Sequence, residues 1–216
     1  FGLGGMVIGG EATRYLAPYQ RKIGPDPASI NTARVGGIVA NNSSGMCCGT
    51  RDNSYHTIES IKLILADGSY LDSGDEESVA AFRLSHAQFL AELGALRAKI
   101  LADEVLHERI ATKYRLKNTT GYGVNALIDF EDPLDILIHL IVGSEGTLAF
   151  ISEVTYRTVP EYPHKASAFI YFDSLEECCR AVQALRGEAP VEAVELLDGK
   201  TTHFVGEVIE DIPPFF

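Results

Sequence analysis

Residues 35 to 49 concentrate the residue types that could bind an anion through the main chain. The stretch reads Val-Gly-Gly-Ile-Val-Ala-Asn-Asn-Ser-Ser-Gly-Met-Cys-Cys-Gly. Glycine lets another group approach the backbone closely, and a row of small residues can turn several N–H groups toward one phosphate. The stretch therefore predicts a loop that cradles the phosphates of a nucleotide.

A second stretch of small residues lies about a hundred positions later, at Gly143-Ser144-Glu145-Gly146-Thr147. It follows an apolar helical pattern and precedes a pattern typical of a strand. Two such stretches, both bounded by apolar runs, predict two walls of one nucleotide site. The alternative is that their glycines only form tight turns, and either stretch taken alone leaves both interpretations open.

The cysteines and histidines do not indicate a metal site. Cys47-Cys48 and Cys178-Cys179 are adjacent pairs without CxxC spacing, so they cannot by themselves bind zinc or an iron–sulfur cluster. We interpret them as reduced, small apolar side chains, with covalent attachment of a flavin to Cys47 or Cys48 as an open alternative. The histidines show no spacing typical of ligands and are interpreted as surface or helix-face residues; they are His56, His86, His107, His139, His164 and His203.

The composition is that of a globular protein with an acidic balance. The chain has 216 residues, 46% of them hydrophobic, and a formal net charge of −12. This charge argues against a nucleic-acid groove, which needs clustered cations; we interpret Lys113, Arg115 and Lys117 as the solvated end of a helix. No apolar run is long enough to span a membrane. Phe1 is not a natural start, so we expect a fragment or a processed product.

The elements that must position the two small-residue stretches are a mixture of helices and strands. Proline and glycine predict a loop at residues 24–29, and Asp67-Gly68 predicts a hairpin turn. Asp132-Pro133 predicts the start of a helix, and Ser85 with Gln88 predicts a capping box. The remaining predictions are a helix at 11–22 that ends near Pro18, a strand at 58–66 followed by one at 70–71, helical structure from 75 to 113, and a strand at 148–159.

A second domain is predicted to begin near Tyr162, after the proline break. Residues 168–172 and 191–197 have the pattern of strands, and residues 174–186 have that of an amphipathic helix capped by Ser174. This β-α-β order is typical of the opening of a ferredoxin-like unit, which cannot close its own core with so few elements. The sequence therefore predicts an α+β protein with two domains.

The joint order of several motifs resembles the FAD-binding domain of the vanillyl-alcohol-oxidase superfamily, which is of the PCMH type. The motifs are Gly-Pro-Asp-Pro-Ala-Ser, Val-Gly-Gly-Ile-Val-Ala-Asn-Asn-Ser-Ser-Gly, Leu-Ala-Asp-Gly, Thr-Gly-Tyr and Gly-Ser-Glu-Gly-Thr-Leu-Ala-Phe-Ile-Ser-Glu, and they span residues 24 to 159. The most similar branch is the FAD-linked D-2-hydroxy-acid dehydrogenases. The resemblance implies a partial FAD-binding domain (its second subdomain) at 1–161 and the beginning of a ferredoxin-like substrate-cap domain at 162–216.

The resemblance also implies FAD as the cofactor and a set of residues that bind it. The stretch from Val35 to Gly45 would lie against the pyrophosphate and ribityl chain, mostly through backbone N–H groups. The segment from Pro25 to Ser29 would approach the flavin, and Glu145, Gly146 and Ile151 would contact the adenosine end. The implied cofactor-binding residues are Pro25, Asp26, Gly36, Gly37, Asn41, Asn42, Ser43, Ser44, Gly45, Glu145, Gly146 and Ile151.

Two departures from the family pattern leave the substrate open. Ser44-Gly45 stands where relatives usually have two glycines, and Arg51-Asp52 where they have Tyr-Gly. The Asn-Asn-Ser-Ser-Gly-Met-Cys-Cys-Gly version is typical of long members that also carry an iron–sulfur domain. The implied activity is oxidation of a small D-2-hydroxy acid by hydride transfer to the flavin, with the electrons then passed to a quinone or cytochrome. The first candidate substrate is D-lactate, and D-2-hydroxyglutarate and glycolate are the alternatives. A non-catalytic nucleotide-binding module is the alternative from another class.

The same resemblance implies that important parts lie outside residues 1–216. The first FAD subdomain would precede Phe1, and the histidine motif that holds the catalytic base and a divalent metal would follow Phe216. No catalytic residue is therefore assigned within this chain, and the fragment alone is expected to be inactive. The implied location is the cytoplasm, with peripheral association with the inner membrane as an alternative.

Overall fold

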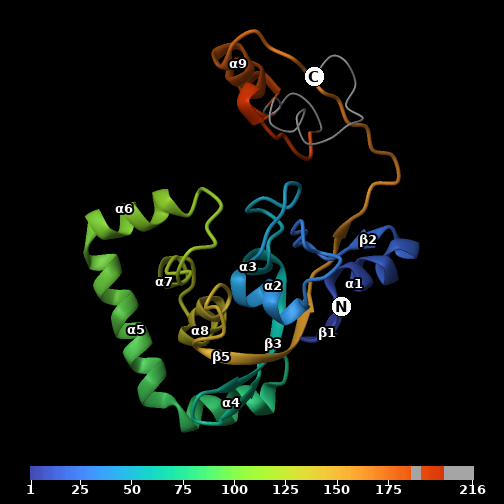
Figure 1. The fold of residues 1–216 in the computed structure, drawn as a ribbon. Helices are drawn as coiled ribbons and strands as arrows, with labels where there is room; N and C mark the ends of the chain where they lie inside the picture. The colour runs from blue at the N-terminus through green and yellow to red at the C-terminus, as the bar shows by residue number, and fades with distance from the viewer. Residues whose placement is uncertain (186–190, 202–216) are drawn as a thin grey trace. The chain divides into compact units, whose positions relative to one another are not determined.

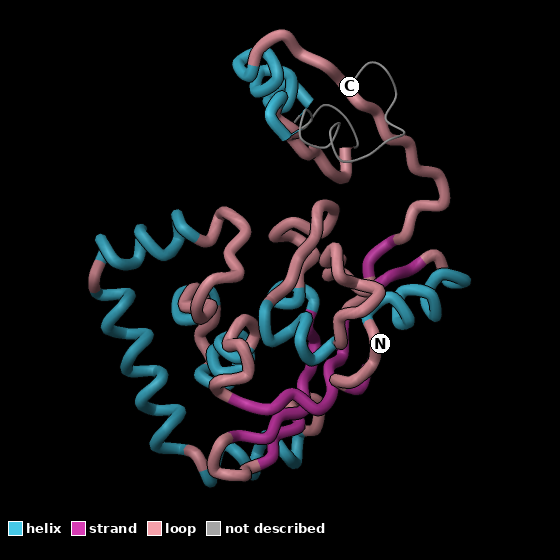
Figure 2. The backbone as a smooth tube through the Cα atoms, in the orientation of Figure 1, coloured by secondary structure: helices cyan, strands magenta, loops and turns pink. Residues whose placement is uncertain are grey.

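The computed structural model describes residues 1–185 and 191–201, which divide into two compact units at Ser167 and Ala168. The first unit is built on an antiparallel four-stranded sheet with the order β1-β5-β3-β4 (Figures 1 and 2). Its strands are β1 (Gly2–Gly4), β3 (Ile58–Leu65), β4 (Tyr70–Asp72) and β5 (Ala149–Tyr156). A second, two-stranded sheet pairs β2 (Arg21–Lys22) with β6 (Val159–Pro160). The predicted mixture of helix and sheet is therefore confirmed.

The helices of the first unit pack around this sheet. Helix α2 packs against β5, α4 packs against β4, and α5 packs against α7 and α8 (Figure 1). The helices are α1 (Gly9–Leu16), the 3₁₀ helix η1 (Ala17–Tyr19), α2 (Val35–Asn41), α3 (Ser54–Thr57), α4 (Glu76–Ser85), α5 (Ala87–Ala102), α6 (Glu104–Lys113), α7 (Ala126–Asp129) and α8 (Pro133–Ile141).

One core connects the sheet to the helices that carry the two small-residue stretches. Val35 and Val39 of α2 are fully buried, as are Leu63 and Val154 of the sheet. Ile141, the last residue of α8, is also fully buried. Burying these side chains is the main favourable term in folding, so the core fixes the ends of α2 and α8 relative to β5.

Several predicted elements form as expected. The hairpin of β3 and β4 turns at Asp67-Gly68, where Gly68 has a φ of 85° and the Asp67 carboxylate accepts the N–H of Ser69 at 2.9 Å. Helix α8 begins after Asp132, whose carboxylate accepts the N–H of Leu134 at 2.9 Å. Residues 24–29 form a loop.

Other predictions are wrong, each for a local reason. The first helix ends near Pro18 as expected, but residues 21 and 22 of the predicted range are not helical, because Gln20 takes a left-handed conformation with φ 54° and Arg21 starts strand β2. The capping box is not formed: Ser85 ends α4 and donates to the Ala81 carbonyl at 3.0 Å, while the Gln88 side chain donates to Glu92. A serine in a last helical turn often bonds back to a carbonyl in this way.

The second unit contains the predicted helix, α9 (Leu175–Leu185), but not the predicted strands. The N–H of Glu177 donates to the Ser174 hydroxyl at 3.2 Å, so Ser174 caps the helix as expected, while residue 186 lies outside the described part. Residues 168–172 and 191–197 form no strand, because neither segment has a partner in a ladder of hydrogen bonds among the described residues. The ferredoxin-like cap and the boundary at 161 and 162 stay predictions.

Candidate functional site

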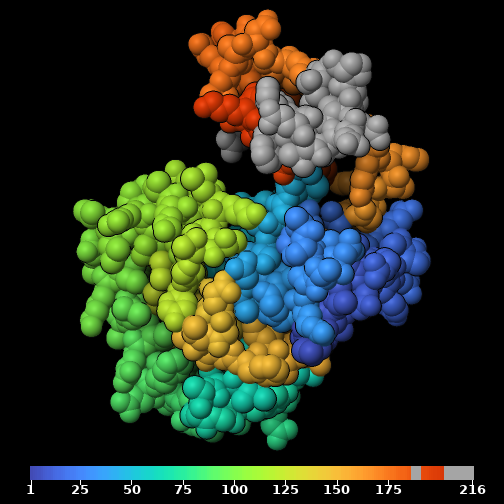
Figure 3. Space-filling view, viewed as in Figure 1, coloured from blue at the N-terminus to red at the C-terminus, as the bar shows by residue number. Residues whose placement is uncertain are grey.

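The two small-residue stretches are in direct contact. The N–H of Gly143 donates to the Val39 carbonyl at 3.0 Å, and the N–H of Glu145 donates to the Ala40 carbonyl at 2.8 Å. The Asn41 amide also donates to the Glu145 carboxylate. Figure 3 shows the light blue surface of residues near 40 beside the gold surface of residues near 145. Segments a hundred residues apart thus meet at the C-terminal end of α2.

The first stretch is a helix followed by a loop, not a loop throughout. Val35, Ile38 and Val39 are spaced as one buried helical face, and this burial makes residues 35–41 helical. Asn42 ends the helix in the left-handed conformation, with φ 51°, and its side-chain oxygen accepts the N–H of Tyr55 at 3.2 Å. Asparagine tolerates this conformation better than most residues, which explains its position.

Most of the backbone donors that we assigned to the phosphates are already bonded within the protein. The N–H groups of Gly36, Asn42 and Ser43 donate to the carbonyl oxygens of Gly5, Val39 and Ile38, at 2.8 to 2.9 Å. The expected cradle of free N–H groups is therefore wrong at these positions, because helix formation and packing on β1 use the donors. The residues stay predicted contacts, but through side chains or close approach of the backbone.

Gly37 is the glycine of α2 that leaves space for a ligand. A Cβ placed on Gly37 would meet no atom within 4 Å, and the residue is exposed. At Gly36 the same carbon would lie 3.1 Å from the Gly5 carbonyl oxygen, so that glycine is needed for packing. The outer face of α2 at Gly37 is thus smooth and open, as the approach of a cofactor requires.

Asp26 organises the loop that follows α2. One carboxylate oxygen accepts the N–H groups of Gly45 and Cys48, at 3.0 and 3.2 Å, and the other accepts that of Cys47 at 3.2 Å. A Cβ at Gly45 would lie 1.9 Å from the Asp26 carbonyl oxygen, so only glycine fits there. The structure therefore places Asp26 and Gly45 in a contact that shapes the loop, while Pro25 beside them is buried.

Two serine hydroxyls in these loops are buried without a hydrogen-bond partner among the described residues. They belong to Ser44 and Ser144, one from each stretch, with residue exposures of 7% and 1%. An unpaired buried hydroxyl costs about 1–3 kcal/mol, so most native proteins avoid it. Both oxygens are sealed from the surface, so neither hydroxyl contacts a ligand in this conformation, and the feature that fits FAD is the open face of α2 at Gly37.

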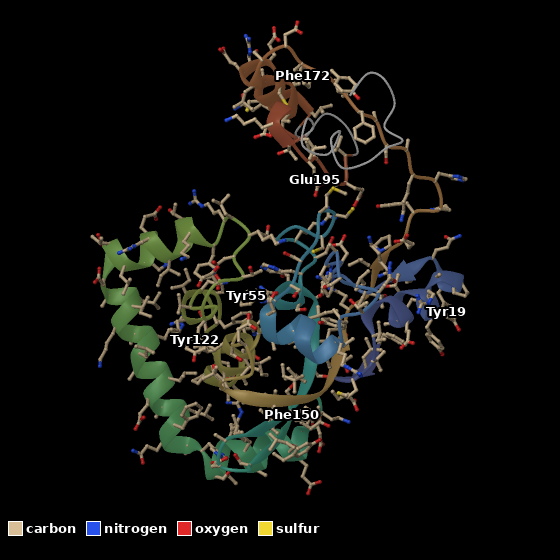
Figure 4. All side chains as sticks on the ribbon, viewed as in Figure 1. Tyr19, Tyr55, Tyr122, Phe150, Phe172 and Glu195 are labelled. Atoms are coloured by element: carbon tan, nitrogen blue, oxygen red, sulfur yellow. The ribbon has the colours of Figure 1, made fainter. Side chains whose placement is uncertain are left out.

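A third segment, residues 114–125, completes this region and was not predicted as part of the site. The Lys117 ammonium donates to the Ser44 carbonyl, and the Tyr122 hydroxyl lies 2.9 Å from the Thr147 hydroxyl. Figure 4 labels Tyr122, and the lime surface of this segment adjoins the two stretches in Figure 3. The Tyr114 hydroxyl donates to the Tyr122 carbonyl at 2.7 Å and steadies the loop. Lys113 ends α6 and is exposed, as interpreted. Lys117 is also exposed, but it lies beyond the end of α6 and bonds to the first stretch.

Behind the site lies a buried polar cluster around Tyr55 (Figure 4). The Tyr55 hydroxyl donates to the Asp129 carboxylate at 2.8 Å, and burial together with this contact raises the pKa of Tyr55. His139 stacks on Phe130 with ring centroids 3.8 Å apart, and burial lowers its pKa. The cluster holds Asn42 through the N–H of Tyr55, so it supports the end of α2 from within the core.

The remaining predicted residues divide between surface and core. Glu145 and Gly146 are exposed and have positive φ values of 55° and 73°, so the loop at 143–147 is sharply turned. Ile151 lies within β5 with only 7% of its surface exposed, which leaves its backbone as the part that a ligand could touch. Burial raises the pKa of the Cys48 thiol to about 11, which disfavours the thiolate needed for flavin attachment.

Neither a metal site nor a membrane span is found in the described part of the chain. No group of three or more histidine, cysteine, aspartate or glutamate side chains in residues 1–185 and 191–201 could hold a metal ion. Over the same residues, every helix is too short or too polar to cross a bilayer.

Comparison with known proteins supports the assignment of the cofactor. Residues 3–74 match the family described as "FAD binding domain", so the predicted resemblance and FAD as the cofactor are confirmed for this part. The chain is 26% identical over 96% of its length to a D-2-hydroxyglutarate dehydrogenase of Pantoea ananatis, and 23% identical over 96% to that of Escherichia coli. A D-lactate dehydrogenase of Archaeoglobus fulgidus is 23% identical over 86% of the chain.

The chain spans only part of these relatives. It covers 21% of both D-2-hydroxyglutarate dehydrogenases and 30% of the D-lactate dehydrogenase. Among solved structures, an alkyldihydroxyacetonephosphate synthase aligns with 74% of this chain and 19% of its own, at 17% identity and a TM-score of 0.39.

Proposed function

We propose that this chain is the FAD-binding part of a flavoprotein dehydrogenase that oxidises a D-2-hydroxy acid to the 2-oxo acid. The observation that carries the proposal is the meeting of the stretches at 35–45 and 143–147, within and beside the part that matches an FAD binding domain. The non-catalytic nucleotide-binding module would use the same residues, so the two functions differ only in the chemistry that follows binding.

The residues of this chain bind and orient the cofactor. Gly37 gives the cofactor a smooth face of α2, and the exposed turn at Glu145 and Gly146 forms the second wall. Asp26 keeps the loop at 43–49 in one shape through three N–H bonds. FAD, when bound, supplies the chemistry by accepting a hydride from the substrate carbon, while the protein positions it.

We propose a short aliphatic D-2-hydroxy acid as the substrate and a quinone or cytochrome as the electron acceptor. The sequence pattern favours D-lactate, whereas relatives from Pantoea ananatis and Escherichia coli carry the name D-2-hydroxyglutarate dehydrogenase. These two acids differ by a side-chain carboxylate, so one assay can separate them.

The test is an FAD titration followed by a dye-reduction assay. We expect the purified protein to quench FAD fluorescence saturably and, within the complete enzyme, to reduce a dye with D-lactate or D-2-hydroxyglutarate but not with the L-acids. Binding of FAD without reduction by any D-2-hydroxy acid would favour the non-catalytic module. If neither this chain nor the complete enzyme bound FAD, although both were folded, both functions would be refuted.

A further inference from the structure

Lys117 lies at the first of the two stretches, where its ammonium group bonds to a backbone carbonyl and not to a carboxylate. Its Nζ donates to the carbonyl oxygen of Ser44, 73 positions earlier in the chain. None of the ion pairs found within residues 1–185 and 191–201 includes Lys117. The protein has 30 acidic residues against 18 lysines and arginines, so acidic partners are abundant and this cation still has none there.

The surroundings of Lys117 also lack partners for polar atoms. An ammonium group has three donors, and the Ser44 carbonyl takes one of them. The hydroxyl of Ser44 itself, and that of Ser144 in the neighbouring stretch, are buried and unpartnered among the described residues. Lys117 is exposed, so its other two donors are open to water or to a ligand that carries several oxygen atoms, whereas the two sealed hydroxyls are not.

We propose that Lys117 makes the cationic contact to the diphosphate of FAD. This inference rests on the proposed function, since it names a further binding residue for the cofactor of the same site. The contact would take the place of part of the expected binding of the diphosphate by backbone N–H groups. The N–H groups of Gly36, Asn42 and Ser43 are bonded internally, so the charge of the diphosphate needs donors from other residues. Lysine binds phosphate as a compact point charge, and Tyr122, bonded to Thr147, holds its loop against the site.

The test compares ligands with and without phosphate on matched lysine variants. Lys117→Met removes the charge and keeps the length of the side chain; Lys113→Met makes the same change in the last turn of α6, where the side chain is exposed. FAD, ADP and riboflavin are titrated against the complete enzyme, as wild type and as each variant. We expect Lys117→Met to weaken FAD and ADP binding by about ten- to a hundred-fold and riboflavin binding by less than about two-fold. Lys113→Met should bind all three ligands like wild type.

Each other outcome overturns the inference and is distinguishable from failure of the proposed function. An equal loss for all three ligands would mean that Lys117 only positions the loop at Ser44. Unchanged FAD and ADP binding, with a higher KM for the D-2-hydroxy acid, would assign the cation to the carboxylate of the substrate. Lys117→Arg separates charge from folding: it should keep FAD affinity within about three-fold, and an affinity as weak as that of Lys117→Met would refute a charge contact. If the wild-type complete enzyme bound no FAD, the proposed function would fail first.

Discussion

Replacing Gly37 by valine should abolish or severely weaken FAD binding while leaving the fold intact. A Cβ at this position meets no atom within 4 Å, and φ is not in the left-handed region, so valine fits the protein itself. In a helix valine is slightly better than glycine, so the free energy of unfolding should change by less than about 1 kcal/mol. The damage comes from two methyl groups on the face that the cofactor must approach.

The structure allows the magnitude to be bounded and the steric cause to be isolated. If the displaced cofactor loses one good contact, its affinity for the protein falls at least about ten-fold, which corresponds to about 1.4 kcal/mol of binding free energy. Gly37→Ala, with one carbon, should lie between wild type and Gly37→Val. Gly4→Val is the control, because Gly4 is also open to solvent but lies on β1 outside the proposed contacts.

The assay is fluorescence titration with FAD, with thermal unfolding of each variant measured in parallel. A folded Gly37→Val protein with wild-type affinity for FAD would refute the assignment of this face of α2 to the cofactor. Loss of folding in Gly37→Val would contradict the open space around its Cβ.

Three further predictions concern stability. Gly45→Ala should lower the free energy of unfolding by more than about 1 kcal/mol, because the new carbon would overlap the Asp26 carbonyl 1.9 Å away; an unchanged urea midpoint would contradict this. Asp26→Ala should cost about 1.5–3 kcal/mol, since three N–H groups lose a charged acceptor, and Asp26→Asn should cost less in the same urea titration. Because burial lowers the pKa of His139 below its ordinary 6.5, the unfolded chain binds its proton more readily, and stability should fall as the pH drops below about 6.5. His139→Gln should flatten that decline between about pH 7.5 and 5.5, and an equally steep decline in the variant would assign the pH dependence to other groups.

Elements whose signals are local were predictable from the sequence. The hairpin at Asp67-Gly68 and the start of α8 at Asp132-Pro133 depend on turn and cap chemistry within four residues, and both form as expected. Strand β2 depends instead on pairing with β6, about 140 residues later, and no local pattern at Arg21 indicates that partner. The fold class was therefore predictable, whereas the small sheet was not.

The interpretation of residues 35–45 was less accurate because composition was given more weight than periodicity. Val35, Ile38 and Val39 follow the i, i+3, i+4 spacing of a buried helical face, a signal present in the sequence, and the structure makes this segment α2. Glycine at 36 and 37 then serves close packing on one side and open access on the other, and neither position needs a left-handed conformation.

This change from loop to helix alters how the site can hold a negative charge. A loop of small residues would offer several free N–H groups, but a helix packed on β1 and β5 commits those of Gly36 and Asn42 to carbonyl groups of the protein. Side chains from other segments must then bind the negative charge of the ligand, and Lys117 is the cation that a third loop places at Ser44. Its position 73 residues away explains why neither motif spacing nor composition could assign it to the site. On the proposal for Lys117, the donors for phosphate would therefore depend on tertiary contacts more than on the glycine-rich stretch itself.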